Sequence, residues 1–289
     1  MTELFAFSLS GLTVGFVYAL VGMGFTVIYN SSGIINFAQG EFVMAGGMIM
    51  VFVLAAGVPT VPAFAIAVAL TALLGMALWK LIDLSRDSSQ VSLIILTLGY
   101  AIFLRGLTEV VLDKELHTMP SFVGDGAFEV AGTVVSYQSL LIVAVSILIV
   151  VGLYLFFRHT RTGKAMIAVS DNPESARLMG INIRVILLIN FALSASIAAV
   201  GGILLTPIAS TNYEVGIMLG LKGFAAAIIG GLSNPFGAVL GGLILGIIEA
   251  LVAGYLSSEY KDAVAFVIML LILFVRPGGI FSTLKAQRV

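Results

Sequence analysis

Apolar segments long enough to cross a lipid bilayer follow one another along almost the whole chain. A helix needs roughly 20 apolar residues to cross the hydrocarbon core. Because lipid offers backbone groups no hydrogen-bond partners, such segments form helices, whose backbone bonds are internal. A membrane barrel is disfavoured, since barrel strands are short and alternate in hydrophobicity, whereas these runs are continuous. The candidate spans are 4–29, 34–57, 61–82, 91–112, 137–157, 185–209, 217–232, 236–256 and 262–275.

The composition supports a protein that is embedded in lipid. Of the 289 residues, 60% are hydrophobic and 10% are charged, whereas soluble domains carry about a quarter charged residues. The net charge of −1 gives no indication of a nucleic-acid partner. The lack of Cys excludes a disulfide framework or a thiolate metal site. His117 and His159 lie in different polar loops, so we expect no metal site.

Two candidate spans are doubtful as simple crossings of the membrane. The second contains Glu41, and the span 217–232 is short and contains Lys222. Either segment fits a full crossing or a broken or re-entrant helix. The sequence therefore predicts an all-α integral membrane fold, with one transmembrane domain over residues 1–289. We expect a polytopic helix bundle of about eight or nine crossings.

Glycine pairs four residues apart occur in the first span and in the span 236–256. Small residues at this spacing let the backbones of two membrane helices approach closely. Glycine is also frequent in membrane helices generally, so a single pair indicates little. Together the pairs predict a tightly packed bundle and no particular function. They are Gly11/Gly15, Gly237/Gly241 and Gly242/Gly246.

The Lys and Arg residues of the loops predict which side of the membrane each loop faces, because cytoplasmic loops carry an excess of them. The loop 113–136 has Lys114 as its sole Lys or Arg, so we expect it to face outward. The loop 158–184 and the C-terminus are predicted to be cytoplasmic. The side of the N-terminus stays open, because it depends on whether 34–57 crosses fully. The positive residues are Arg158, Arg161, Lys164, Arg177 and Arg184 in the loop, and Arg276, Lys285 and Arg288 in the tail.

The loop 158–184 is predicted to contain two short helices separated by a turn. The first covers 164–169 and is opened by Thr162-Gly163. The second begins after Asn172, because an asparagine side chain accepts a hydrogen bond from a backbone N–H of the first turn. Proline at the first helical position, an acid in the first turn and glycine after the end are typical of a helix. These residues are Pro173, Glu174 and Gly180.

Short helices between membrane spans have no role in crossing lipid, which favours a docking surface for a cytoplasmic partner. The apolar step Leu178-Met179 supports this interpretation. The alternative is an ordinary positive loop that only sets the topology. The sequence has no catalytic constellation and no G-x-x-x-x-G-K-[ST] loop for phosphate. We therefore expect no enzyme activity and no cofactor in this chain. Any ATP and Mg used in transport must be held by partner subunits.

Four blocks, in the same order, resemble the permease subunits of high-affinity branched-chain amino-acid ABC importers. The block VGFVYALVGMGFTVIYNSSGIINFAQGEFVMAGG (14–47) resembles the start of these permeases. The block GKAMIAVSDNPESARLMGIN (163–182) is similar to their cytoplasmic coupling loop. Blocks 220–251 and 257–281 are similar to their C-terminal half. The resemblance covers nearly the whole chain and favours the first of the family's two permease subunits.

The sequence departs from the family pattern in three places. Gln39 stands where members commonly have His, which bears on the substrate. Ile167 replaces an Arg that is usual in the coupling loop, which bears on the ATPase contact. The segment 81–90 does not match the family's usual basic loop. None of these departures alters the expected fold.

The resemblance implies a multi-pass permease of the bacterial inner membrane that pairs with a second, homologous permease to form the pore. It also implies two cytoplasmic ATPase subunits, which bind ATP and Mg, and an extracytoplasmic solute-binding protein. That protein would deliver a branched-chain amino acid or a relative. The residues that the resemblance assigns to ATPase coupling are Gly163, Lys164, Asp171, Pro173, Glu174, Ala176, Arg177, Leu178 and Gly180.

Asn36, Gln39 and Glu41 are polar residues that the resemblance places at a broken helix beside the translocation pathway. An intramembrane carboxylate is costly, so it faces a partner, a cavity or water. We expect these residues and Lys222 to contribute to the pathway, with Lys222 as a partner for Glu41. The alternatives are an interfacial position for Glu41 and, favoured over the pairing, a Lys222 side chain that reaches the outer interface.

Two other functions remain as rivals to the importer. An ion-gradient-driven secondary transporter would use Glu41 as a proton or sodium site, and the intramembrane carboxylate alone supports it. A passive channel or structural membrane subunit would need no elaborate cytoplasmic loop. The two predicted helices within 158–184 therefore count against both rivals.

Overall fold

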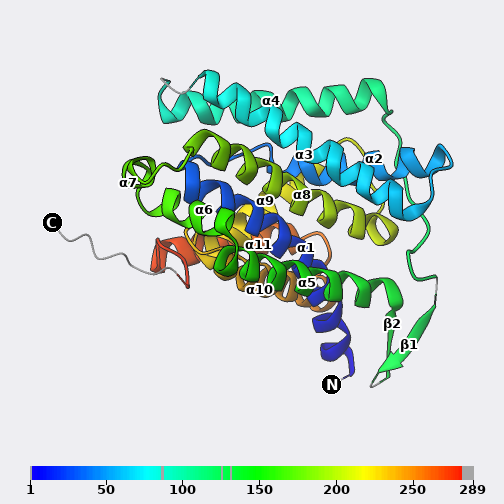
Figure 1. The fold of residues 1–289 in the computed structure, drawn as a ribbon. Coiled ribbons are helices and arrows are strands. Elements are labelled where there is room, and N and C mark those ends of the chain that lie inside the picture. Colours follow the sequence, from blue (N-terminus) through cyan, green and yellow to red (C-terminus); the bar gives the residue numbers. More distant parts are fainter. Residues whose placement is uncertain (1, 86–87, 125, 131, 282–289) are drawn as a thin grey trace.

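The computed structural model describes residues 2–85, 88–124, 126–130 and 132–281 of the chain. These residues form eleven helices and one two-stranded sheet (Figure 1). Lys285 and Arg288, which we expect on the cytoplasmic side, lie outside the described residues. The elements are α1 (Thr2–Ser32), α2 (Gln39–Ala55), α3 (Thr60–Leu84), α4 (Gln90–Val111), β1 (Ala127–Val130), β2 (Thr133–Ser136), α5 (Tyr137–His159), α6 (Arg161–Asp171), α7 (Pro173–Leu178), α8 (Ile183–Ala209), α9 (Val215–Gly230), α10 (Pro235–Tyr255) and α11 (Lys261–Val275).

Each of the nine predicted spans coincides with one helix. The largest difference is at α2, which begins at Gln39 rather than at residue 34. Within the described chain, six helices are long and apolar enough to cross a membrane, namely α1, α3, α4, α5, α8 and α10. Helices α2 and α9 are apolar but shorter, with 17 and 16 residues. The prediction of a polytopic helical membrane bundle is confirmed, while the number of crossings stays a prediction.

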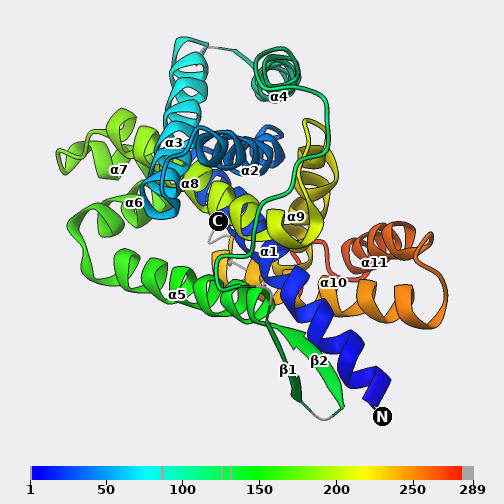
Figure 2. The same ribbon diagram turned by 90° about the vertical axis from the view of Figure 1, so that its right-hand side faces the viewer.

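Helix α1 forms the centre of the bundle. It packs against α8, α9 and α10 (Figures 1 and 2), and every residue from 15 to 28 is buried. A helix that is apolar on all sides is expected to be buried on all sides. A β-carbon at Gly11 would lie 2.7 Å from the Gly246 carbonyl oxygen, and one at Gly15 would lie 3.0 Å from that of Gly242. The predicted close packing through glycine pairs is confirmed at this contact between α1 and α10.

Helix α4 lies at the edge of the molecule, where α2 and α3 are its neighbours (Figure 2). Many of its apolar side chains are largely exposed, among them Ile95, Ile102 and Phe103. Apolar side chains that face outward fit a helix in contact with lipid or with another membrane subunit. Buried residues such as Leu104 mark the face that α4 turns toward the bundle.

The segment 113–136, predicted as a plain outward loop, contains an antiparallel hairpin. Strand β1 pairs with β2 so that Ala127 faces Ser136 and Val130 faces Thr133. β-branched residues favour extended backbone, but strands of four residues are too short to give a clear alternating pattern. The expectation of an all-helical chain therefore needs this small correction, which leaves the membrane bundle unchanged.

Candidate functional site

The chain leaves helical geometry between α1 and α2, over residues 33–38. Gly33 has a φ of +68°, which glycine adopts without strain. The side chain of Asn36 accepts a hydrogen bond from the Ala38 backbone N–H, and the Phe37 N–H donates to Thr97 of α4 at 3.3 Å. These bonds supply partners for the backbone groups that a broken helix leaves unpaired. The chain is therefore non-helical between α1 and α2, while a broken or re-entrant helix within the membrane stays a prediction.

The start of α2 lies inside the bundle rather than at its end. Gln39 contacts Gly24, about two turns before the end of α1, and Ser194, about three turns into α8. The Gln39 amide donates to the Ser194 carbonyl oxygen at 3.2 Å. Asn36 and Gln39 are fully buried and bonded to each other or to these neighbours, so they form a closed polar contact in this structure.

Glu41 forms an ion pair with Arg105, which the sequence analysis missed. The Glu41 Oε1 to Arg105 Nη2 distance is 2.5 Å, and Glu41 is 2% exposed. The predicted pairing of Glu41 with Lys222 is wrong, whereas its depth in the membrane stays a prediction. Among the described residues, neither Glu41 Oε2 nor Arg105 Nε has a hydrogen-bond partner. The pair therefore keeps unused bonding capacity on both sides.

A cavity of about 270 Å³ adjoins this ion pair. Three aromatic rings line it, with centroid distances of 5.5 Å between Phe25 and Phe224 and 5.8 Å between Phe37 and Phe224. Glu41 and Arg105 are the charged residues of the lining, which is otherwise apolar or glycine. The remaining lining residues are Leu98, Ala101, Ile102, Gly216, Ile217, Gly220 and Leu221.

The first turns of α2 and α9 meet beside the cavity. A β-carbon at Gly40 would collide with the Gly216 carbonyl oxygen and would lie 2.7 Å from the Gly220 Cα. A β-carbon at Gly216 would lie 2.7 Å from Glu41 Oε2. The carboxylate of Glu41 thus lies at the N-terminal end of α9, where the helix dipole favours negative charge. Only glycine allows this approach, which explains its use at these positions.

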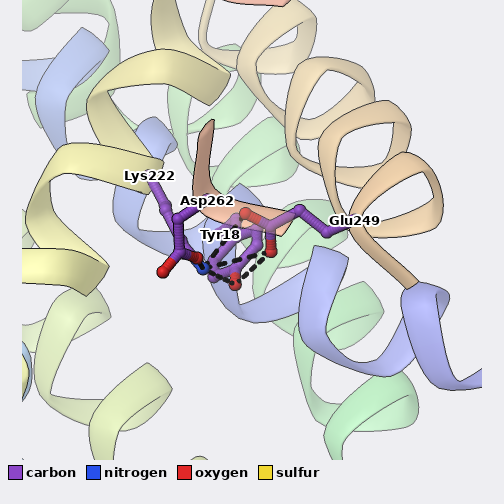
Figure 3. A network of polar contacts seen from close by, with 4 residues as sticks. All are labelled: Tyr18, Lys222, Glu249 and Asp262. Carbon is purple, nitrogen blue, oxygen red and sulfur yellow. Dashed lines mark hydrogen bonds and ion pairs between the residues drawn. The ribbon is translucent and has the colours of Figure 1, made fainter. Parts of the chain in front are cut away.

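Lys222 belongs to a second buried cluster (Figure 3), and it is not among the residues that line the cavity beside Glu41 and Arg105. Its Nζ lies 3.0 Å from Glu249 Oε1, 2.6 Å from Asp262 Oδ1 and 3.2 Å from the Tyr18 hydroxyl. Tyr18 in turn donates to Glu249 at 2.7 Å. The prediction that Lys222 reaches the outer interface is wrong, because these acceptors from α1, α10 and α11 satisfy its ammonium inside the protein.

The loop 158–184 folds into α6 and α7, as predicted. Helix α6 begins at Arg161 rather than at residue 164, because Thr160 is its N-cap and accepts a hydrogen bond from the Gly163 N–H at 2.9 Å. Asn172 caps α7 by accepting from Ser175 N–H at 2.9 Å, and Pro173 occupies its first turn. Gly180 follows with a φ of +81°, which fits the predicted helix stop.

The nine predicted coupling residues divide into an outer and an inner set. Gly163 and Ala176 are buried, and Ala176 packs with Met166, Val169 and Ile186 of α8. The others are exposed, and Leu178 and Met179 are more than four-fifths exposed. The exposed set is Lys164, Asp171, Pro173, Glu174, Arg177, Leu178 and Gly180. A larger cavity, of about 850 Å³, lies between this helix pair, the end of α1 and the start of α10.

Comparison with known proteins shows what kind of chain carries these features. The family described as branched-chain amino acid transport system / permease component matches residues 7–273. The chain belongs to this family. The permease is 34% identical to the high-affinity branched-chain amino acid transport system permease protein BraD of Pseudomonas aeruginosa, over 97% of its own length and 96% of BraD.

Further relatives of the permease point the same way. It is 33% identical to LivH of Escherichia coli, a high-affinity branched-chain amino acid transport system permease protein, over the full length of both. A probable LivH of Methanocaldococcus jannaschii is 30% identical over 90% of the permease and 87% of that chain. In the PsaBC structure from Streptococcus pneumoniae, solved with a Fab, one chain matches with a TM-score of 0.54 and 12% identity, covering 93% of the permease and 91% of that chain. This last likeness concerns the fold alone.

Sequence reasoning missed the partners in both charged clusters of the permease. Arg105 and Glu249 lie inside predicted spans, where any ionisable residue is a functional or structural signal by itself. That signal is visible in the sequence and identifies both residues as members of buried pairs. Which charge pairs with which depends on how the helices pack, and Tyr18 or Ser194 gives no comparable signal.

Proposed function

We propose that the permease moves branched-chain or related amino acids inward, as one membrane subunit of an ATP-driven importer. The observation that carries this proposal is the full-length match to relatives described as branched-chain amino acid transport permeases. A second, homologous permease completes the pore, and an extracytoplasmic binding protein supplies the solute. Two cytoplasmic ATPase subunits bind ATP and Mg, for which this chain has no phosphate-binding loop.

In the proposed topology, α1 to α5 and α8 to α11 cross the inner membrane nine times, with the N-terminus outside. The direction alternates along the chain, so α6, α7 and the end of α11 share the cytoplasmic side (Figure 1). Helices α2 and α9 are about 25 Å long, shorter than the roughly 30 Å hydrocarbon core. The non-helical residues 33–38 and 210–214 complete these two crossings inside the protein, where other residues satisfy their backbone.

Helices α6 and α7 are the proposed docking surface for the ATPase. Their exposed residues would contact it, while Gly163 and Ala176 fix the pair against α5 and α8. Movement of the ATPase is thereby passed to two membrane helices. A shift between states must originate where ligand contacts differ between those states, and ATP-driven docking supplies such a difference.

Asn36, Gln39 and Glu41 are proposed to lie at the pathway in the closed state of the permease. The hydrogen bonds of Asn36 and Gln39 would have to open during transport. The pairing of Glu41 with Arg105 counts against the secondary-transporter alternative, because the carboxylate already has a cationic partner and needs neither a proton nor sodium to balance its charge.

The first test is purification of the tagged permease from its native membrane in mild detergent, with mass spectrometry of the co-purifying proteins. We expect two ATPase chains and a sister permease, and uptake of leucine into proteoliposomes that requires ATP and the binding protein. A permease that purifies alone and moves solute under an ion gradient would overturn the proposal.

The docking role is tested by Asn172→Ala, which removes the N-cap of α7 and destabilises that helix by about 1 kcal/mol. We expect the assembly to hydrolyse ATP without matching leucine uptake. Ser89→Ala is the matched control, because Ser89 caps α4 in the same way and lies far from α7 in the chain. Equal uptake in the two variants would contradict a docking role for α7.

A further inference from the structure

We propose that Glu41 and Arg105 form a binding site for a zwitterionic α-amino acid, whose ammonium binds Glu41, whose carboxylate binds Arg105 and whose apolar side chain enters the 270 Å³ cavity. This inference deepens the proposed function and rests on it. It assigns to the membrane subunit a solute site of its own, separate from whatever selection the binding protein makes.

The first argument is the unused bonding capacity of the pair. Glu41 is almost completely buried, and within the described chain its Oε2 accepts no hydrogen bond. Arg105 Nε is also buried without a partner. Buried polar atoms of native proteins are almost always bonded, so an exception next to a cavity indicates a group that arrives from outside. An ammonium supplies the missing donor for Glu41 Oε2, and a carboxylate supplies the missing acceptor for the Arg105 Nε–H.

The second argument is charge balance. Glu41 and Arg105 together are neutral, and so is an amino-acid zwitterion. Its entry replaces one ion pair by two, Glu41 with ammonium and Arg105 with carboxylate, and leaves no charge unpaired. A carboxylic acid of the same shape would leave the buried Glu41 without its counter-charge, which is strongly unfavourable, and an amine would leave the partly buried Arg105 without one. Arginine also suits a carboxylate by geometry, because it donates two parallel hydrogen bonds.

The third argument is the shape and chemistry of the walls. Phe25, Phe37 and Phe224 face the cavity, and α4 adds Leu98 and Ile102, which are also exposed on the surface of the chain. The volume lies just below the range of about 300–1,000 Å³ that holds drug-sized ligands, as expected for a smaller solute. The described lining offers no third charge to a charged side chain. The site therefore favours apolar amino acids over lysine or glutamate.

The fourth argument is that Arg105 is able to move. Its side chain is 28% exposed and belongs to α4, which has fewer contacts with the bundle than the central helices. Glu41, by contrast, is held at the N-terminal end of α9. A solute can therefore separate the pair by displacing Arg105 while the carboxylate stays in place.

The test measures direct binding to the purified, assembled transporter in nanodiscs with the binding protein omitted, by saturation-transfer NMR. The probes are L-leucine, 4-methylpentanoate, 3-methylbutylamine and L-lysine. We expect L-leucine to bind weakly, with Kd of about 1 mM, and the other three at least about tenfold more weakly. Glu41→Gln and Arg105→Gln should each weaken L-leucine binding about tenfold or more, whereas Arg105→Lys should retain part of it.

Two further variants separate a binding role from a folding role. Leu98→Trp narrows the cavity without changing either charge, so it should weaken binding of L-leucine and spare glycine, a smaller zwitterion. Lys114→Gln changes an exposed cation at the end of α4, which pairs with Glu109, and should leave binding unchanged. ATP hydrolysis by each assembly shows that the variants have folded.

Each outcome distinguishes the inference from the proposed function. If the assembly takes up leucine with ATP but L-leucine binding is absent or indifferent to Glu41→Gln and Leu98→Trp, the inference is wrong and the importer stands. Equal binding of 3-methylbutylamine and L-leucine would also overturn it, because charge balance would not matter. If the assembly takes up no branched-chain amino acid although it hydrolyses ATP, the proposed substrate class is wrong, whichever amino acid the site binds.

Discussion

Two clusters of charge lie buried in this bundle, and they differ in how completely their groups are paired. Around Lys222, one ammonium faces two carboxylates and a tyrosine hydroxyl from three other helices. Glu249 Oε1 and Asp262 Oδ1 have no hydrogen-bond partner among the described residues, but both lie within ion-pair distance of this ammonium. Glu41 and Arg105 form a single pair that borders a cavity and leaves an oxygen and a nitrogen unused. The Lys222 cluster lines neither of the two cavities described above.

The completeness of pairing separates structural charge from functional charge in a membrane. A buried charge is tolerated when it is fully paired, and such a cluster fixes which helices lie together. For the Lys222 cluster those helices are α1, α9, α10 and α11 (Figure 3). A pair with spare capacity beside an apolar cavity instead retains the means to exchange its partner for a solute. Burial alone does not distinguish the two cases.

The largest effect on stability is expected from Lys222→Met. It leaves Glu249 and Asp262 close together without their cation, which should cost about 3–5 kcal/mol. Helix α11 contacts the rest of the protein mainly through α9 and α10, so its amides should lose protection in hydrogen exchange. The exposed pair Lys114–Glu109 is the control, and Lys114→Met should change Tm little. An unchanged Tm for Lys222→Met would contradict a structural role for the Lys222 cluster.

Gly246→Val should have the next largest effect, about 1–3 kcal/mol of destabilisation. A β-carbon at Gly246 would collide with Gly11 and Gly15, and the separation of α1 from α10 would also break the Tyr18–Glu249 hydrogen bond. Thermal unfolding in detergent measures the loss. Gly106→Val is the matched control, because in the described structure a β-carbon there has open space around it. Equal Tm values for both variants would contradict close packing at this contact.

Arg105→Gln should destabilise the permease less than Lys222→Met, by about 1–2 kcal/mol, because Arg105 is partly exposed and Glu41 keeps the N-terminal end of α9 nearby. A double-mutant cycle with Glu41→Gln isolates the energy of the pair, measured as Tm or chemical unfolding. A small coupling energy together with an about tenfold loss of leucine binding would support a binding role for this pair. A coupling as large as the Lys222 effect would make both clusters structural.

The smallest effect concerns Asp113, outside the membrane helices. The side-chain hydrogen bond from His117 holds the pKa of the Asp113 carboxyl below its usual value of 3.8. Its folded pKa is lowered, so the stabilisation is present above pH 3.8 and is lost as the pH falls through the folded value. We expect the Tm difference between the wild type and Asp113→Asn to be present at about pH 5 and to shrink in stronger acid. A difference that shrinks near neutral pH instead would contradict this assignment.

Much of the fold follows from the sequence, because lipid demands helices of a minimum length and because caps mark helix ends. The nine spans, the Asn172 cap and the glycine contacts of α1 with α10 were predictable for these reasons. The start of α6 was placed three residues late, since Thr160 was not recognised as its cap.

The pairing of charges was not predictable in the same way. Lys222 lies 27 residues from Glu249 and 204 from Tyr18 in the chain. Which of several buried acids it meets is decided by the packing of four helices, and no local pattern encodes that. Glu41 was singled out from the sequence as a carboxylate inside an apolar segment, but its partner on α4 and the aromatic cavity became visible only in three dimensions.

We infer that the pair Glu41–Arg105 opens to admit an amino acid while the Lys222 cluster stays closed. The most direct test is cryo-electron microscopy of the assembled transporter in nanodiscs with excess L-leucine. We predict density for leucine between Glu41 and Arg105, with its side chain against Phe224 and with the Lys222 contacts unchanged. Leucine bound elsewhere in the membrane domain, with the Glu41–Arg105 ion pair still intact, would contradict a solute site at this pair.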